Sequence, residues 1–258
     1  ALGEYYMNRE MDHIAATVRE MLLAKKSSRL KQQEATGYDV CDGRRNPREV
    51  LGDVCGLLFS GHQPFGFKGN TQNYYSSANS YMNQVIDRRR GIPITLSLIL
   101  VIVCKRLGIR RVFPVGMAGH FICSYLPNGE VDGEFISACP LESGVFFIDS
   151  FHNGRFLSRE QCHEFMGSHF PTLNTSPDRL DAFLHPVLPK NILQRVLQNL
   201  VHLKCRTLQD VLTKFTLMGL IMELAKHAQT DFAQIVECAL QQIRLLPKLL
   251  HKYAGFPA

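Results

Sequence analysis

The sequence lacks any apolar run long enough to cross a membrane as a helix. A spanning helix needs about 20 consecutive apolar residues, and the most apolar stretch extends only from Gly91 to Val103. No signal peptide is recognisable, and the chain begins Ala-Leu-Gly without an initiator Met. We therefore expect a protein without a transmembrane segment. Import into an organelle stays open, because a cleaved transit peptide leaves no trace in a mature chain.

Paired cysteines and clustered metal ligands are also missing. The eight cysteines are widely spread and form no CxxC motif: Cys41, Cys55, Cys104, Cys123, Cys139, Cys162, Cys205 and Cys238. This distribution predicts free thiols in a reducing intracellular compartment, either the cytoplasm or the matrix of mitochondria or another organelle. Only Cys162 and His163 adjoin each other, with no second pair nearby, so we predict no metal and no cofactor.

The basic excess is moderate. The net charge is +6 and the pI is about 8.9, which permits contact with RNA, anionic membranes or acidic proteins without requiring any of them. Arg88, Arg89 and Arg90, together with Arg110 and Arg111, are the candidates for contact with a protein or RNA partner. The alternative is a solvated or salt-bridged edge.

Apolar periodicity predicts a series of helices. The predicted helical ranges are 8–33, 48–60, a segment capped by Asn79 or Ser80, 93–107, 159–170 after a Ser158–Gln161 capping box, 190–205, 208–228 and 231–253. The helix from Pro93 is apolar on nearly every side, which indicates burial at the centre of the fold. Pro suits its first position, where no N–H is needed, and Gly108 ends it.

Strands are predicted over 111–115, 120–126 and 144–150, with turn residues between them. Beyond residue 189 strand signals stop and only amphipathic helices follow, the last two resembling one tetratricopeptide-type hairpin. We predict an α+β core with a central buried helix against a small antiparallel sheet. The predicted divisions are an N-terminal helical segment (1–45), the core (46–188) and a helical annex (189–258).

Several ordered motifs in this core resemble a known family. They are Gly66–Asn70, Asn79-Ser80, Arg88-Arg89, Gly91–Ile94, Ser97, Leu107-Gly108, Gly119–Phe121 and Ile148-Asp149. Together they resemble the transglutaminase-like (papain-like) core of the bacterial SirB-type family, which is also found in some F-box proteins. In that family tetratricopeptide-like helices follow the core. The resemblance extends over residues 45–250.

In active transglutaminase-like proteins a Cys begins the central helix, a His follows on the next strand and an Asp on the one after. The helix N-terminus stabilises the thiolate, the His takes the proton and the Asp orients the His. The resemblance assigns the last two roles to His120 and Asp149, but Pro93 stands at the Cys position. Proline has neither a nucleophile nor an N–H for an oxyanion.

Thr95 and Ser97 are the nearest replacements for the missing nucleophile. Ser97 lies about one turn into the helix and would need a base within about 3 Å. The alternative is a buried hydroxyl bonded to the carbonyl four residues back in its own helix. Likewise, His120 and Asp149 could be a structural pair that ties two strands together.

We therefore favour a non-catalytic protein that serves as an interaction or scaffold subunit, with other protein subunits as partners. One alternative is a hydrolase or acyltransferase that uses Ser97 or Thr95 with His120 and Asp149. Another is an RNA-associated structural subunit of an organelle complex such as a mitochondrial ribosome.

Overall fold

The computed structural model describes residues 2–30, 45–61, 64–132, 135–137, 142–170 and 176–201. Its helices are α1 (Leu2–Leu30), α2 (Pro47–Phe59), α3 (Met82–Arg88), α4 (Pro93–Arg106), α5 (Arg159–His169), α6 (Pro177–Asp181) and α7 (Pro189–Val201), with 3₁₀ turns η1 (Ser77–Asn79), η2 (Ser150–His152) and η4 (Ala182–Leu184). The last two predicted helices, at 208–253, lie outside the described residues. None of the described helices is long and apolar enough to span a membrane.

The strands form one main antiparallel sheet and two small pairs. The strands are β1 (Lys68–Gly69), β2 (Arg90–Gly91), β3 (Val112–Val115), β4 (Ile122–Tyr125), β5 (Glu130–Asp132), β6 (Phe135–Ser137), β7 (Phe146–Asp149) and β8 (Arg155–Leu157). The main sheet has the order β3-β4-β7-β8, while β1 pairs with β2 and β5 with β6. The mixed helix and sheet composition agrees with the predicted α+β class.

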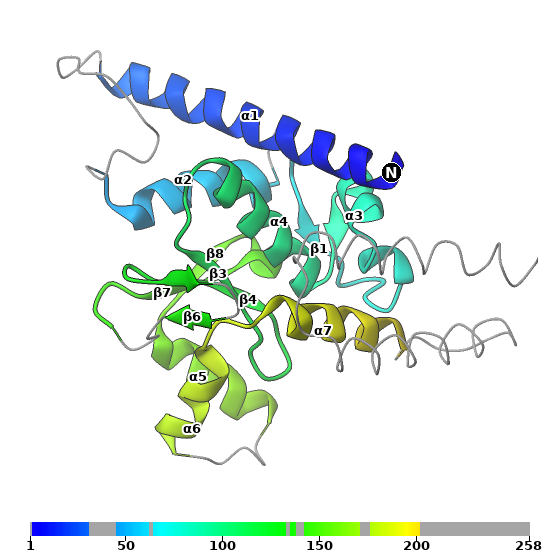
Figure 1. Cartoon of the computed structure of the whole chain (residues 1–258), viewed down its shortest axis with the longest axis vertical. Coiled ribbons are helices and arrows are strands. Elements are labelled where there is room, and N and C mark those ends of the chain that lie inside the picture. Colours follow the sequence, from blue (N-terminus) through cyan, green and yellow to red (C-terminus); the bar gives the residue numbers. More distant parts are fainter. Residues whose placement is uncertain are drawn as a thin grey trace, which may run out of the picture.

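The sheet separates two apolar clusters, as the period-two alternation of side chains requires. Phe146 and Ile148 of β7 face the cluster that contains α4, whereas Phe147 between them faces the cluster that contains α5. In Figure 1, α1 lies along one side of the molecule with α2 and α4 beneath it, and α5 and α6 lie beyond the sheet. The main core is therefore built on α4, which is covered by α1 and the sheet.

Helix α4 is buried as predicted. Pro93 is its first residue, Leu107 its C-cap, and Gly108 takes the left-handed backbone conformation with φ 86°. Ten of its residues are buried, from Pro93 through Leu100 with Val103 and Cys104. The capping box of Ser158 and Gln161 at α5 is also confirmed, and α2 begins and ends within one residue of its predicted bounds.

Several local predictions are wrong. The structure forms β5 and β8 where turns were expected. The sequence did not indicate these strands, because each is only three residues long and adjoins strong turn residues. Asn79 does not cap α3; Tyr81 holds that position, and Asn79 is buried in η1. Met21, expected on the apolar face of α1, is exposed.

Candidate functional site

The start of α4 and the turn before β4 lie at the same end of the core. Helix α4 leads directly into β3, and β3 runs antiparallel to β4, with Val115 opposite Ile122. Ser97, one turn into α4, donates a hydrogen bond of 3.3 Å to the carbonyl of Phe121. Pro93 and His120 therefore occupy the same end of the core, as the resemblance implies.

Asp149 meets His120 at this end. Strands β4 and β7 are antiparallel with Cys123 opposite Ile148, so the end of β7 adjoins the start of β4. The Nε2 atom of His120 lies 3.0 Å from Oδ1 of Asp149, and both side chains are buried. The structure therefore brings together the second and third members of the predicted triad.

Two further side chains, which were missed in the sequence, bind the same carboxylate. Nδ1 of His152 lies 2.7 Å from Oδ2 of Asp149, and the backbone N–H of His152 donates to Oδ1 at 3.2 Å. Arg155 donates to Oδ2 from Nε at 3.3 Å and from Nη2 at 3.1 Å. The spacing Asp149-x-x-His152 was the available signal, because an Asp that begins a 3₁₀ turn can accept a hydrogen bond from the backbone N–H three residues on.

Asp149 is ionised at neutral pH. Burial alone would raise the pKa of its carboxyl group, but the hydrogen bond and charge of His120, with those of His152, outweigh burial and hold the pKa well below its usual range. An ionised carboxylate only accepts hydrogen bonds, so the ring nitrogens that face it carry their protons. His120 is then protonated on Nε2, and its Nδ1 receives no hydrogen bond from a described residue.

The position of the expected nucleophile holds no reactive group. Pro93 is the first residue of α4 and follows the N-cap Ile92, so this turn of the helix offers neither a thiol nor an N–H at residue 93. The single O–H of Thr95 lies within hydrogen-bond distance of the carbonyls of Asn79 (2.9 Å) and Ile92 (3.1 Å), and its oxygen accepts the Ile92 N–H at 3.1 Å. Thr95 therefore caps the helix.

Ser97 is likewise bonded to the backbone, although not as expected. Its hydroxyl does not bond the carbonyl four residues back; it reaches across to Phe121 and links α4 to the turn that carries His120. Among the described residues, neither Ser97 nor Thr95 forms a hydrogen bond to His120. The sequence could not show this, because the choice of acceptor depends on how α4 packs against β4.

A buried amide organises the chain before α4. The Asn79 side chain accepts from Asn70 Nδ2 at 3.0 Å and donates to the carbonyls of Asn73 (2.8 Å) and Tyr74 (3.0 Å). Arg88 approaches the same Oδ1 at 3.4 Å. These contacts hold the loop that carries Tyr74 and Tyr75. The loop lies beside the cluster of His120, Asp149, His152 and Arg155, here called the His120 centre, because Phe151 contacts both the Tyr74 ring and the His120 ring. Several of the motif residues therefore serve to shape this loop.

Aromatic rings and one arginine surround His120. Its ring lies 5.2 Å from the Phe165 ring and 6.1 Å from the Phe151 ring. Arg195 of α7 donates to the carbonyls of Met117 (3.2 Å) and His120 (3.1 Å). The turn between β3 and β4 is thus held in two ways: aromatic rings pack against the His120 side chain, and Arg195 binds the backbone carbonyls of Met117 and His120.

Gly119 allows this turn to form. Its φ is 69°, and a Cβ at this position would lie 2.2 Å from the Phe170 ring. A side chain would therefore meet both backbone strain and a clash.

A comparison of the sequence with models of known protein families agrees with this geometry. The model of the family described as the Transglutaminase-like superfamily matches residues 6–198. The chain belongs to this superfamily. Pro93, His120 and Asp149 thus lie within a transglutaminase-like domain, and α1 and α7 fall largely within the matched range.

The relatives with assigned names are of two kinds. A UPF0162 protein of Xylella fastidiosa is 33% identical over 138 residues, which are 54% of this chain and 44% of that protein. F-box only protein 21 of Mus musculus and of Homo sapiens is 33% identical over 138 residues, or 53% of this chain and 19% of that protein. The chain thus spans less than half the length of these relatives. No solved structure matches.

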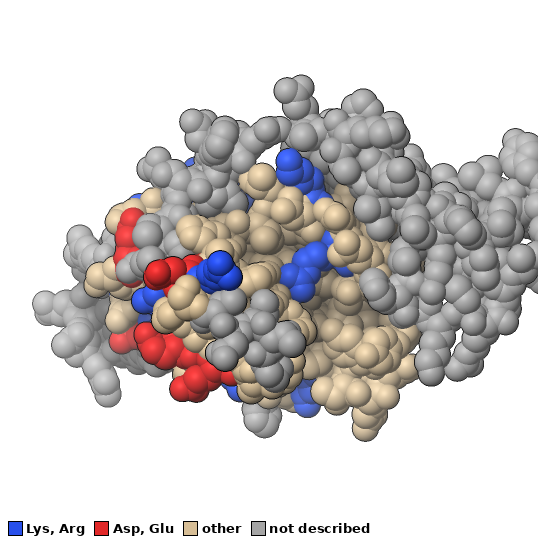
Figure 2. Space-filling view, turned by 90° about the horizontal axis from the view of Figure 1, so that it is seen from below, with Lys and Arg blue, Asp and Glu red and all other residues tan. Residues whose placement is uncertain are grey.

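The candidate arginines of this transglutaminase-like domain do not form one surface. Arg90 precedes α4 and Arg110 follows it, so the two runs are separated by a helix of 14 residues, roughly 20 Å long. Arg89 turns inward and lies 4.7 Å from the Phe67 ring centroid. On the face in Figure 2, basic side chains occur singly, while acidic ones gather at one side. The distribution of charge on that face therefore does not support an RNA partner.

The described cysteines are buried and form no disulfide among the described residues: Cys55, Cys104, Cys123 and Cys162. Burial raises the pKa of Cys123 to about 12 and the pKa of Cys162 to about 12. Neither is an activated thiol. Cys162 is buried while its neighbour His163 contacts Asp181, so the Cys162–His163 pair forms no shared site. Cys41, Cys139, Cys205 and Cys238 lie outside the described residues.

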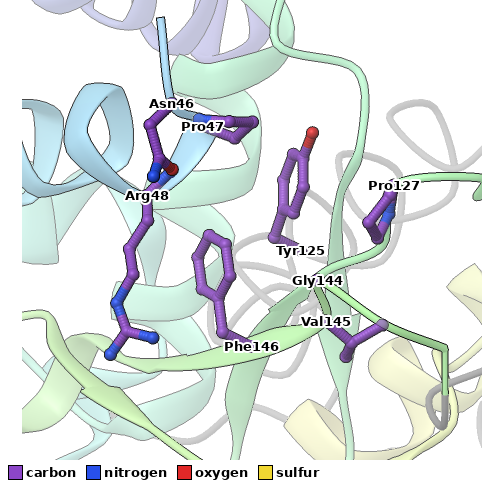
Figure 3. Close-up of a pocket in the computed structure, with 8 residues that line it drawn as sticks. All are labelled: Asn46, Pro47, Arg48, Tyr125, Pro127, Gly144, Val145 and Phe146. Carbon is purple, nitrogen blue, oxygen red and sulfur yellow. The ribbon is translucent and has the colours of Figure 1, made fainter.

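A separate pocket lies at the other end of the sheet. Tyr125 ends β4 and Phe146 begins β7, and their rings stack at 5.0 Å between centroids. With Arg48 and other residues they line a pocket of about 370 Å³ (Figure 3). Asp149 and His120 adjoin the opposite ends of the same strands, so this pocket is distinct from the His120 centre.

Proposed function

We propose that this transglutaminase-like protein is non-catalytic and acts as an interaction or scaffold subunit of a larger protein assembly. The observation that carries the proposal is the start of α4, where Pro93 stands at the position that the family resemblance assigns to the nucleophile, while His120 and Asp149 remain paired. The hydroxyls of Thr95 and Ser97 are bonded to backbone carbonyls of Asn79 and Phe121, which disfavours the hydrolase or acyltransferase alternative.

An exposed aromatic loop is the best candidate for partner contact. Tyr75 has 74% of its surface exposed and Tyr74 has 38%, although large aromatic side chains usually lie inside. The buried Asn79 amide fixes this loop, so the two rings are presented in a defined position. Tyr is enriched in protein interfaces, where a rigid ring adds contact area at low entropic cost. The F-box proteins among the relatives also suit a protein-interaction role.

A site-specific crosslinking experiment tests the partner role. A photoreactive benzoyl-phenylalanine replaces Tyr75 in the full chain, and the matched control carries it at Tyr5, which is 67% exposed on α1. After irradiation in cells, we expect a defined protein adduct at position 75 and none at position 5. No adduct at 75, or the same adducts at both positions, would argue against the proposal.

A second measurement tests the absence of catalysis. A fluorophosphonate probe labels activated serine and threonine nucleophiles, and we expect no labelling of Ser97 or Thr95 in the folded chain. Labelling of Ser97 that disappears in His120→Ala would establish the hydrolase alternative instead. The compartment, whether cytoplasm, mitochondrial matrix or another organelle, stays a prediction that imaging of the tagged protein can decide.

A further inference from the structure

His120, Asp149 and His152 converge on one point. One ligand atom from each, two ring nitrogens and a carboxylate oxygen, lies within 4.8 Å of the others. In the part of the chain that the structure describes, this is the only group of three such side chains. We infer that these three residues form a binding site for a divalent transition-metal ion, with Zn²⁺ as the expected ion.

The donor set fits this ion. Two imidazoles and one carboxylate suit Zn²⁺, Co²⁺ and Ni²⁺, and zinc sites with three protein ligands leave a fourth position for water. Ligands held about 2.1 Å from a tetrahedral ion lie roughly 3.4 Å apart. Nε2 of His120 lies 3.0 Å from Oδ1 of Asp149, and Nδ1 of His152 lies 2.7 Å from Oδ2 of the same carboxylate. To admit the ion, each histidine moves away from the carboxylate by roughly half an ångström, and the two ring nitrogens, which lie within 4.8 Å of each other, adopt the tetrahedral spacing.

The ion takes the place of the protons between the histidines and the carboxylate. In the metal-free protein, Nε2 of His120 and Nδ1 of His152 carry the protons that face Asp149. When the ion binds, these protons leave through water, each ring keeps one proton on its other nitrogen, and the freed lone pairs face the metal. The ligand nitrogens would then be Nε2 of His120 and Nδ1 of His152.

The surrounding groups would orient the ligands and admit the ion. The backbone N–H of His152 still donates to Oδ1 of Asp149 and fixes the carboxylate, as a supporting shell does in known metal sites. Asp149 is fully buried, and 6% of the His120 side chain is exposed, whereas 45% of the His152 side chain is exposed. The ion would therefore enter from the side of His152.

Arg155 opposes the ion. Its guanidinium group bonds Oδ2 of Asp149, so its positive charge lies next to the proposed metal position. Like charges at this distance repel, although the exposed position of Arg155 reduces the effect. We therefore expect only moderate affinity in the parent chain. Removal of this charge should strengthen binding, which a merely structural role for Arg155 does not predict.

A second constellation in the same chain supplies a matched control. Asp181 also binds one arginine and one histidine, with Nε2 of His163 at 2.9 Å from Oδ1, but it has no second histidine. His163→Gln therefore removes a comparable ring from a comparable pair while leaving the proposed site intact. Because the control keeps every other histidine and cysteine, it also accounts for binding elsewhere in the chain.

Zn²⁺ is titrated calorimetrically into the full-length metal-free chain, and Co²⁺ binding is followed by visible absorption. Relative to the parent, we expect His152→Gln to lose more than about tenfold in zinc affinity. We expect Arg155→Gln to gain on the order of tenfold and His163→Gln to be unchanged. The Co²⁺ spectrum should show nitrogen and oxygen ligation without thiolate charge-transfer bands.

Three results would overturn the inference: equal affinities of the parent and His152→Gln, an equal loss in His163→Gln, or a spectrum dominated by thiolate ligation. Thermal melts of each variant without metal separate loss of ligand from loss of fold. The inference does not depend on the partner-binding role, because the metal is titrated into the isolated chain. Failure of the metal-binding inference would leave the proposed partner role unaffected, and the reverse also holds.

Discussion

Asp149 and Asp181 are the centres of two similar ionic groups that lie in different parts of the fold. Each carboxylate binds an arginine and a histidine. Asp181 ends α6 and connects it to α5 through Arg159 and His163. Asp149 is the last residue of β7, at the end of the core where α4 begins, and it binds two histidines.

The comparison shows how surroundings decide what the same residues contribute. For Asp181 the hydrogen bond from Arg159 is the main cause of a lowered pKa, with burial opposing it. For Asp149 burial is the largest influence and raises the pKa, yet its histidine partners overcome it. The partners of Asp181 are both partly exposed, Arg159 to 37% and His163 to 17%, so water can replace a lost bond. His120 is nearly enclosed and has no such substitute.

Loss of the two carboxylates should therefore have unequal effects. Asp149→Ala leaves the buried His120 without its acceptor and removes the acceptor of His152 and Arg155, so we expect the free energy of unfolding to fall by about 3 kcal/mol. Asp181→Ala leaves two half-buried partners that water can still reach, so it should cost about 1 kcal/mol. Urea denaturation of both variants measures the difference. Equal losses would contradict the distinction between the two centres.

Acid should weaken the contribution of Asp149. Its folded-state pKa lies below the unfolded value of about 3.9, so its stabilising effect is complete above that value and is lost as the pH falls toward the folded-state pKa. The stability difference between the parent and Asp149→Asn should therefore shrink as the pH falls below about 4. Denaturation at a series of pH values tests this. A difference that grows in acid would refute it.

Ser97 is a smaller test of the same centre. Its hydroxyl is the donor that links α4 to the turn that carries His120, so Ser97→Ala should lower the free energy of unfolding by about 1 kcal/mol. The reference is Ser168→Ala, whose exposed hydroxyl bonds a carbonyl in its own helix and should have almost no effect. Identical melting temperatures for the two variants would show that the link across to Phe121 contributes nothing.

Thiol reactivity should show the smallest effect. Burial raises the pKa of Cys55, Cys123 and Cys162, and Pro93 stands at the position that the family resemblance predicts for a reactive cysteine. With limiting iodoacetamide at neutral pH, none of these three should be alkylated faster than free cysteine. Mass spectrometry of the folded chain identifies the labelled residues. Rapid alkylation of any of the three would contradict the non-catalytic assignment.

The sequence predicted those parts of the fold that local rules determine. Pro93 and Gly108 mark the ends of α4, and the Ser158–Gln161 capping box marks the start of α5. The pairing of His120 with Asp149 was predicted through the family resemblance, because the two residues are 29 positions apart and no local pattern connects them.

The rest depends on tertiary contacts. Arg155 joins the centre because Asn153 and Gly154 adopt positive φ and turn β8 back beside β7. The carbonyl that Ser97 selects depends on the packing of α4 against β4. Asn79 looked like a helix cap, since this is its common role, yet burial directs its amide to the loop of Tyr74.

Arg195 has a consequence for synthesis on the ribosome. It binds the His120 carbonyl from 75 positions further along the chain. At 5–20 residues per second, translation of that interval takes roughly 4–15 s. The four-stranded sheet is fully translated at Leu157, well before α7 emerges. During that interval the nascent turn must remain without one of its two anchors, which is the period when a chaperone would find it exposed.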